Sequence, residues 1–316
     1  MARVTETARR PGAGAFAQRF ARAKRSYQLY LFLLPTLLYF AIFHYGPMYG
    51  LQIAFRDYLG ALGIWGSPWV GLEHFQRFFN SAYFVNLLSN TILLSFFGLI
   101  FDFPVPILFA LMLNQIGNKR YRKLVQTISY APHFISTVVF VGIIFIFLSP
   151  STGIVNILLD GLGLERAYFM GSSAWFRPVY VISNIWKGTG WGAIIYLATL
   201  AGINPELYEA ATIDGATKMQ RILHIDIPGI LPTVTIMLIM RTGSIMAIGF
   251  EQAFLMQTPL NLETSEIIST YVYKVGLMGA QFSFGAAVGL FNSVVNLMLI
   301  ALVNRFARSV GETSLW

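Results

Sequence analysis

Six apolar segments run along the chain, separated by polar or mixed intervals. Each is close to, or longer than, the roughly 20 residues that an α-helix needs to cross the hydrocarbon core of a bilayer. The pattern predicts an all-α integral membrane protein with about six membrane-spanning helices. These helices are expected at residues 27–45, 85–113, 124–148, 179–200, 230–256 and 284–306. Residues 27–306 then form one transmembrane domain between an N-terminal tail, 1–26, and a C-terminal tail, 307–316.

The longest largely polar stretch in the C-terminal half, residues 204–232, lies between the fourth and fifth apolar segments. Asn204 is a suitable N-cap, Pro205 suits the first helical position, and Glu206 lies in the first turn, where the helix dipole favours an acid. Small and apolar residues follow at helical spacing, and Gly215 is placed to end the helix. The stretch predicts a short capped helix with a low-profile docking face. An ordinary interfacial loop helix is the alternative.

The composition is that of a membrane protein. The chain of 316 residues is 56% hydrophobic and only 11% charged, with a mean hydropathy of +0.62, whereas soluble domains are usually about 25% charged. The absence of cysteine excludes disulfides and thiolate metal sites. The four histidines are far apart in the sequence and form no paired ligand motif, so we expect no metal site.

The basic residues are placed unevenly, and their placement predicts the orientation. Most of the 22 lysines and arginines lie in the N-terminal tail, between the second and third apolar segments, in the stretch 204–232 and in the C-terminal tail. Such clusters beside apolar segments face the cytoplasm and anionic lipid. Both termini and the stretch 204–232 are therefore expected in the cytoplasm. This placement beside the membrane accounts for the net charge of +8, so we expect no nucleic-acid binding.

The N-terminal tail also permits another interpretation, a secretory signal peptide. No small-residue cleavage site follows the apolar run that begins at Tyr27, so we expect the tail to stay on the protein. Pro11, Gly12 and Gly14 interrupt any helix in its first half, which is expected to be disordered.

Four ionisable residues lie within the apolar segments: Asp102, Lys187, Arg241 and Glu251. Such residues are costly in a membrane and normally face a bundle interior or an aqueous path. One hypothesis is that they line a hydrophilic translocation path. The other is that they form structural ion pairs, Lys187 with Glu251 and Arg241 with Asp102. Both can hold at once.

No catalytic constellation is present in the sequence. It contains no GxSxG nucleophile motif, no pair of carboxylates flanking a cleft and no GxxxxGK[ST] phosphate-binding loop. The chain therefore cannot bind ATP by that loop. Any energy from ATP must come through a partner.

The stretch 204–232 contains Glu209-Ala210-Ala211, then Asp214-Gly215-Ala216, and later Ile225, Pro228 and Pro232. In these residues it resembles the EAA loop of ABC-importer permeases, a cytoplasmic loop whose coupling helix sits in a groove of the ATPase subunit. Ile222 stands where that family often has Phe, a small departure. The resemblance implies that coupling to the ATPase is carried by Glu209, Ala210, Ala211, Asp214, Gly215, Ile225, Pro228 and Pro232. In this scheme Gly215 gives a sharp turn, Glu209 and Asp214 fix the loop by hydrogen bonds, and the two prolines set the start of the fifth helix.

From Tyr27 to Trp316 the chain is similar to polysaccharide-type sugar permeases, which include subunits of importers for alginate and aldouronate. The stretches in which this resemblance is found include GSPWVGLEHF, SNIWKGTGWG and the terminal SLW. The resemblance implies alternating access for an oligosaccharide in a bacterial inner membrane. The implied partners are a second related permease, two ATPase subunits that bind ATP and Mg, and a periplasmic or lipid-anchored solute-binding protein. Aromatic residues in the external intervals would mark either the membrane interface or the docking surface for that binding protein.

Two other classes of protein are alternatives to an ABC importer. A secondary transporter driven by an ion gradient would show inverted internal repeats and broken helices at the membrane midplane, and no convincing repeat relates the halves of this sequence. A membrane-embedded enzyme would need an acidic or metal cluster at the membrane surface, which the sequence lacks.

Overall fold

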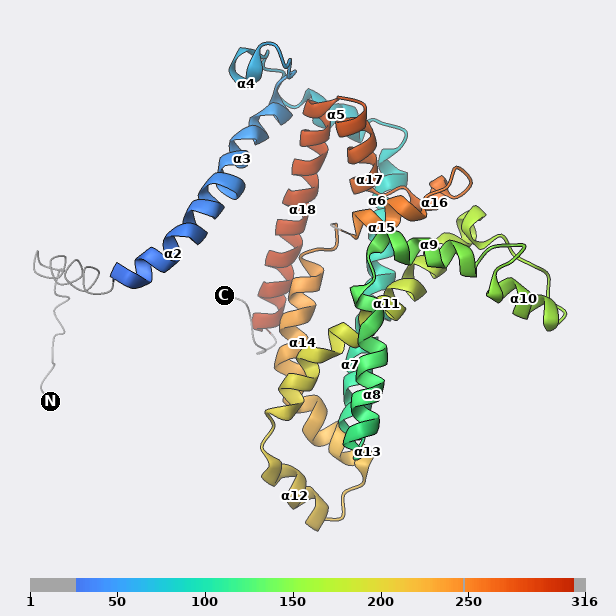
Figure 1. Cartoon of the computed structure of the whole chain (residues 1–316). Coiled ribbons are helices and arrows are strands. Elements are labelled where there is room, and N and C mark those ends of the chain that lie inside the picture. Colours follow the sequence, from blue (N-terminus) through green and yellow to red (C-terminus); the bar gives the residue numbers. More distant parts are fainter. Residues whose placement is uncertain (1–26, 247, 310–316) are drawn as a thin grey trace, which may run out of the picture.

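The computed structural model describes residues 27–246 and 248–309. The N-terminal tail, and with it the expected disorder of its first half, lies outside the described residues. Within them the chain is helical apart from loops and one isolated bridge between Arg56 and Trp69. The predicted all-α membrane class is confirmed. Figure 1 shows an upright helical body with α2 extending away on one side and α12 hanging below.

In the described part of the chain, four helices are long and apolar enough to span a membrane: Tyr27–Phe55, Phe84–Asn114, Lys218–Thr242 and Phe282–Ser309. A fifth is added if the bent pair Lys119–Phe134 and Thr137–Phe147 is counted as one span. The predicted fourth segment also forms one helix, α11 (Ser173–Ala201), whose 29 residues are ample to cross a bilayer. α11 is not among the four helices above because polar residues and glycines interrupt its apolar sequence.

The first span is built from α2 (Tyr27–Phe40), η1 (Ala41–Tyr45), α3 (Gly46–Met48) and η2 (Tyr49–Phe55). No residue of α2 is buried, and the helix stands clear of the body in Figure 1. Only at η2 does the span reach the body, where it packs against α18 (Phe282–Ser309). Two short helices, α4 (Gly63–Gly66) and α5 (Glu73–Phe79), then lead into the second span.

The second span consists of α6 (Phe84–Phe97), the π-helix η3 (Gly98–Asp102) and α7 (Pro104–Asn114). α7 packs along α11, with Ala110 and Leu113 of α7 buried against Ala193 and Leu197 of α11. α8 and η4 also lie against α11. Gly190 of α11 permits that approach, because a Cβ there would lie 2.1 Å from the carbonyl oxygen of Ser129.

The third predicted span, 124–148, is wrong as a straight helix. The structure has α8 (Lys119–Tyr130), η4 (Ala131–Phe134) and α9 (Thr137–Phe147), with a bend of 102°. Pro132 cannot donate a helical hydrogen bond. Ser136 then caps the new helix by accepting a hydrogen bond from the amide of Val139 at 3.4 Å.

The fifth predicted span, 230–256, is also wrong at both ends. Helix begins at Lys218, through α13 (Lys218–Arg221) and the π-helix η6 (Ile222–Asp226), and α14 (Ile227–Thr242) ends at Thr242. The chain leaves the helix after Thr242 and resumes it in α15 (Phe250–Met256). Asn292 and Asn296 of α18 hold the freed backbone of Met246, donating to its carbonyl and accepting from its amide, each at 2.9 Å.

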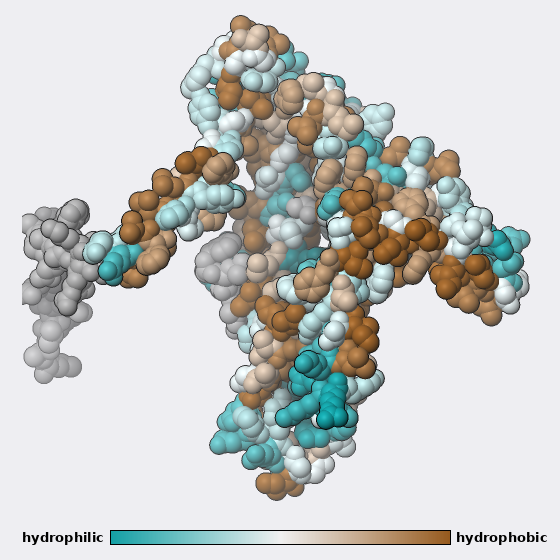
Figure 2. Space-filling model, in the orientation of Figure 1, coloured by the Kyte–Doolittle hydropathy of each residue, from teal (hydrophilic) through white to brown (hydrophobic). Residues whose placement is uncertain are grey.

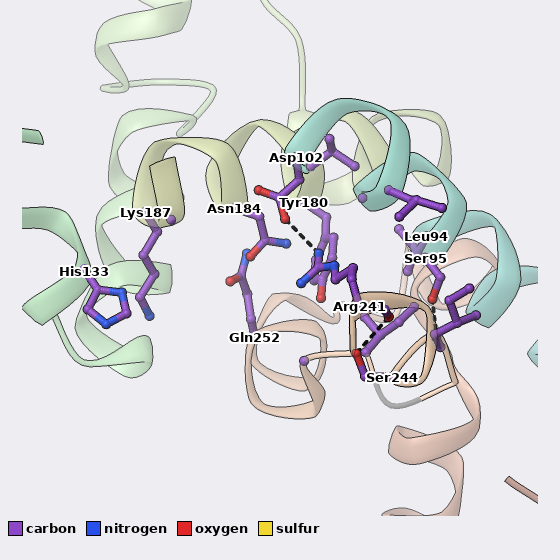
Figure 3. A pocket seen from close by; sticks show the side chains of 17 residues that line it. Leu94, Ser95, Asp102, His133, Tyr180, Asn184, Lys187, Arg241, Ser244 and Gln252 are labelled. Atoms are coloured by element: carbon purple, nitrogen blue, oxygen red, sulfur yellow. Dashed lines mark hydrogen bonds and ion pairs between the residues drawn. The ribbon is translucent and has the colours of Figure 1, made fainter. Parts of the chain in front are cut away.

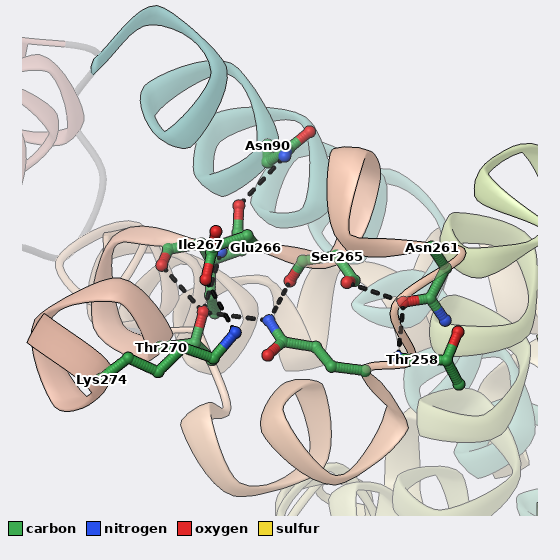
Figure 4. Close-up of polar contacts among 9 residues, drawn as sticks. Asn90, Thr258, Asn261, Ser265, Glu266, Ile267, Thr270 and Lys274 are labelled. Carbon is green, nitrogen blue, oxygen red and sulfur yellow. Dashed lines mark hydrogen bonds and ion pairs between the residues drawn. The ribbon is translucent and has the colours of Figure 1, made fainter. Parts of the chain in front are cut away.

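The upper end of the body is held by buried side-chain amides (Figure 4). The segment here carries α16 (Leu262–Ser265), α17 (Ile268–Tyr271) and η7 (Val272–Met278), while α10 (Ile154–Gly161) and η5 (Phe169–Gly171) lie to the side. Asn90 of α6 donates to the carbonyls of Glu263 and Glu266 at 2.8 and 3.0 Å and accepts from Arg177 at 2.8 Å. These bonds fix the polar segment before α18 against α6 and α11.

Candidate functional site

A cavity of about 360 Å³ opens where η3, η4, α11 and the break after α14 meet. Its wall combines apolar residues of α6 and α11 with polar side chains that point into the space (Figure 3). The principal polar ones are Asp102, His133, Asn184, Lys187, Arg241 and Gln252. Three of the four ionisable residues predicted from the sequence therefore share one cavity.

Arg241 and Asp102 form an ion pair across this cavity, with Arg241 Nη2 and Asp102 Oδ2 2.8 Å apart. The Arg241 side chain is 49% exposed and that of Asp102 17%. Gly98 leaves room for the guanidinium, because a Cβ there would lie 3.2 Å from Arg241 Nη2. The structural ion pair predicted for these two residues is formed, and it lines the cavity as well.

Lys187 has a different environment. Its Nζ donates a hydrogen bond to Thr137 Oγ1 at 3.2 Å and lies 4.9 Å from the centre of the Phe140 ring. Within the part of the chain that the structure describes, no carboxylate oxygen lies within 4.0 Å of this ammonium group. The cavity therefore holds two cations and one carboxylate.

Glu251 lies apart from the other three. It is exposed, in the first turn of α15, and does not line the cavity. The predicted pair of Lys187 with Glu251 is wrong, since Thr137 is the polar partner of Lys187. The break between α14 and α15 turns the neighbouring Gln252 toward the cavity instead, where its Nε2 donates to Ser183 Oγ at 2.9 Å.

Sequence reasoning missed the neutral members of the cavity. Asn184 and Gln252 lie between Lys187 and the Asp102–Arg241 pair (Figure 3). His133 stacks on Trp191, with ring centroids 4.5 Å apart and planes within 2°. Asn184 precedes Lys187 by one helical turn, a signal that the sequence contained. Nothing local to His133 indicated its position, because the bend at Pro132 brings it to α11.

The predicted capped helix is present as α12 (Pro205–Ile213). Asn204 Oδ1 accepts from the amide of Glu206 at 3.1 Å, and Gly215 has a φ of +73°, the left-handed conformation that favours glycine. Thr217 and Gln220 then form a reciprocal capping box that starts α13. The sequence prediction of both helix ends is confirmed.

No residue of α12 is buried, and Tyr208 and Ala211 alone among its residues are partly covered. Glu209 and Ala210 are exposed, Leu207 is 52% exposed and Ile213 is 86% exposed. Figure 2 shows hydrophilic residues gathered at this lower end of the molecule, over α8 and around α12. Large apolar side chains on such a surface are typical of a docking site.

One expectation about this loop is wrong, and a second holds only for Pro228. Among the described residues, the carboxylates of Glu209 and Asp214 have no hydrogen-bond partner, and backbone bonds such as Ala216 N to Ala211 O, 2.8 Å, close the turn instead. Pro228 lies in the first turn of α14, as expected, whereas Pro232 lies inside that helix. Helical structure also continues back from α14 to Lys218.

A buried carboxylate in this loop was also missed. Asp226, next to Ile225 in η6, is 0% exposed and accepts hydrogen bonds from Tyr208 Oη at 2.5 Å and from Gln115 Nε2 at 2.9 Å. Burial and the Asp226 carboxylate raise the pKa of Tyr208 to about 12. The sequence did contain a signal for this buried acid, because Asp226 lies between Ile225 and Ile227, directly before Pro228.

No metal centre is indicated by the geometry. Across residues 27–246 and 248–309, no three His, Asp or Glu side chains are grouped so that they could hold a metal ion. The site is thus a polar cavity among membrane helices together with an exposed capped helix below it.

Known proteins share this chain's sequence and fold. The family model for the "binding-protein-dependent transport system inner membrane component" matches residues 102–311. The Bacillus subtilis protein LplB is 44% identical over 296 residues, covering 94% of this chain and 93% of LplB. The B. subtilis polygalacturonan/rhamnogalacturonan transport system permease protein YteP is 44% identical over 288 residues, covering 91% and 90%.

A solved structure is similar over the same length. A chain of the bacterial alginate ABC transporter in complex with alginate pentasaccharide-bound periplasmic protein is 46% identical, with a TM-score of 0.87, and the match covers 94% of this chain and 99% of that chain. The protein is therefore a member of the family of inner membrane components of binding-protein-dependent transport systems, a permease subunit of an ABC importer and not an enzyme.

Proposed function

We propose that this permease forms half of the translocation path for an acidic oligosaccharide and imports it by alternating access. The observation that carries the proposal is the cavity with two cations, Lys187 and Arg241, against the single carboxylate of Asp102. A site with this excess of positive charge favours uronate groups, and Lys187 has an ammonium group without a carboxylate partner in the described structure. YteP is named for the transport of polygalacturonan and rhamnogalacturonan, and the alginate transporter imports an acidic polysaccharide; both names support the same class.

The other half of the path would come from a second, related permease. Two ATPase subunits would bind ATP and Mg and receive the exposed faces of the two coupling helices, here α12 with Glu209, Ala210 and Ile213. A solute-binding protein would deliver the oligosaccharide from outside. In this arrangement six helices, α11 included, span the inner membrane, with both termini and α12 in the cytoplasm.

The test is uptake by the complete complex reconstituted in proteoliposomes with its binding protein. Lys187→Gln removes the charge and keeps a hydrogen-bond donor. Since a hydrogen bond to a charged group contributes about 1.5–3 kcal/mol, import of a uronate oligosaccharide should fall roughly tenfold or more. Import of a neutral oligosaccharide of the same length, if it occurs, should fall less.

Lys123→Gln on the exposed face of α8 is the matched control, because it removes the same charge outside the cavity. It should transport as the unaltered protein does. Equal loss of acidic and neutral solutes in Lys187→Gln would contradict an acidic substrate. Unchanged import of both would remove Lys187 from the path.

A further inference from the structure

Asp226 joins three parts of the chain that are far apart in sequence. Its Oδ1 accepts the hydrogen bond from Tyr208 of α12, and its Oδ2 accepts that from Gln115, the residue that caps the end of α7. Asp226 itself lies in η6, directly before α14. It is 0% exposed. One carboxylate thus connects the exposed helix, the second span and the fifth span at their common lower end.

Burying a carboxylate is costly unless its oxygens are hydrogen-bonded. Here each oxygen has one donor, and in the described part of the chain no cation lies within 4.0 Å of the group. Tyr208 is a protonated donor at neutral pH, as any tyrosine with a pKa of about 10 would be, and its own pKa is raised further, to about 12. Loss of either donor would leave a buried acceptor without a partner, so the position of Asp226 is tied to both Tyr208 and Gln115.

The same two spans meet again at the cavity. α7 begins at Pro104, two residues after Asp102, and ends at the cap Gln115; α14 begins next to Asp226 and reaches Arg241. Both helices pack on α11 in one core, which includes Leu113 and Ile230. The two spans are therefore joined at one end by Gln115 and Asp226 and at the other by the Asp102–Arg241 ion pair.

Few other side chains connect α12 to α7 and α14. Its residues are unburied, and loops connect it to α11 and α13 (Figure 1). Apart from Tyr208, the hydrogen bond that joins it to the start of the fifth span is that from Arg221 Nη1 to Thr212 Oγ1, at a long 3.5 Å. A displacement of α12 is therefore transmitted to α7 and α14 most directly through Tyr208.

We propose that Asp226 is a positioning residue that transmits movement of α12 to the cavity, by moving the lower ends of α7 and α14 together. The inference rests on the proposed function, in which α12 docks on the ATPase. A displacement of Tyr208 moves Asp226, and Asp226 moves Gln115 through their hydrogen bond. The opposite ends of α7 and α14 then shift at the Asp102–Arg241 pair. Asp226 contacts no solute in this scheme.

The experiment uses the complete complex in lipid nanodiscs and proteoliposomes, with the alginate or polygalacturonate oligosaccharide that the unaltered complex imports. Tyr208→Phe removes only the hydroxyl, which bonds Asp226 and also interacts with the side chain of Asn114 at the end of α7. We expect unchanged co-purification with the ATPase and unchanged basal ATP hydrolysis. The stimulation of ATP hydrolysis by the loaded binding protein should fall at least about fivefold, as should the solute imported per ATP hydrolysed.

A second variant and a control separate transmission from folding. Asp226→Asn should reduce stimulation in the same way, and the double variant should be no worse than Asp226→Asn alone, because both changes break one link. If Asp226→Asn fails to assemble, Tyr208→Phe alone decides. Tyr121→Phe, on an exposed tyrosine of α8, is the control and should leave coupling unchanged.

Normal stimulation and normal solute-to-ATP ratio in Tyr208→Phe would overturn the inference. So would additive losses in the double variant, which would place the two residues on separate routes. Failure of the unaltered complex to hydrolyse ATP in response to any loaded binding protein would instead overturn the proposed function. The two failures are therefore distinguishable.

Discussion

At the scale of single residues, the charge of the cavity depends on the carboxylate beside Arg241. Asp102 neutralises a guanidinium that is half exposed to the space. Lys187, by contrast, is bonded to the neutral hydroxyl of Thr137. Changing one of these residues therefore changes the net charge that an entering solute meets.

Asp102→Asn should tighten the apparent affinity for an acidic oligosaccharide. It frees Arg241, and one more unneutralised cation near the solute contributes about 1 kcal/mol at the high effective dielectric of an open cavity, or roughly a fivefold lower KM for uptake. Arg241→Gln should raise the KM instead. Uptake kinetics of purified complexes test both. Equal KM values in all three proteins would mean that the pair is structural only.

Residue-level patterns predicted the ends of α12 because caps are local. Asn204, Pro205 and Gly215 act on neighbours within a few positions, so their chemistry is readable in the sequence. The junction at Asp226 was not readable in that way. Its burial depends on Tyr208 and on Gln115, which lies 111 positions away.

At the scale of elements, the packing of α11 depends on glycine. Its contact with the end of α8 requires that Gly190 carry no side chain. The apolar pattern predicted the existence and length of the spans, but not the bends at Pro132 and after Thr242. Those depend on partners such as Asn292 and Asn296, contributed by another helix.

Gly190→Ala should destabilise the protein. The added Cβ would meet the Ser129 backbone at 2.1 Å, and overpacking of this kind costs about 1–3 kcal/mol. Thermal unfolding of the purified protein in detergent should show a lower midpoint. Gly289→Ala in α18 is the matched control, because nothing lies within 4 Å of its added Cβ. It should be neutral or slightly stabilising, since alanine favours helix. Equal midpoints for both variants would disprove the close contact.

Gly215→Asp should uncouple the loop while leaving membrane insertion intact. A side chain at a φ of +73° is strained, so the turn after α12 should rearrange. We expect loss of the ATPase from co-purified complexes and at least a tenfold loss of uptake. Gly60→Asp, in the loop before α4 with open space around it, is the control. An intact complex with normal uptake in Gly215→Asp would remove this loop from coupling.

At the scale of the whole molecule, the distribution of charge predicts the orientation. α8 and the surroundings of α12 form one hydrophilic end, with the α4 and α5 region at the other (Figures 1 and 2). The basic residues of α8, Lys119, Arg120, Arg122 and Lys123, lie at the α12 end. That end is expected in the cytoplasm.

Because the chain contains no cysteine, single cysteines can report this orientation directly. Met219→Cys, at an exposed site beside α12, should react with a membrane-impermeant thiol reagent only after the cells are opened. Ser151→Cys, exposed in the loop before α10, should react in intact cells. The reverse labelling pattern would place α12 outside and contradict coupling to a cytoplasmic ATPase.

The bare face of α12 has a consequence for biosynthesis. Leu207 and Ile213 of α12 are exposed in the lone subunit, and in another part of the molecule no residue of α2 is buried. A cell that made this subunit in excess would contain copies in which the apolar side chains of α12 and the surface of α2 are not covered by partner subunits. Such uncovered surfaces promote aggregation and degradation by quality-control proteases. The subunit should therefore accumulate only when its partner subunits are produced in matching amounts. Its half-life in cells that lack those partners measures how far its stability depends on them.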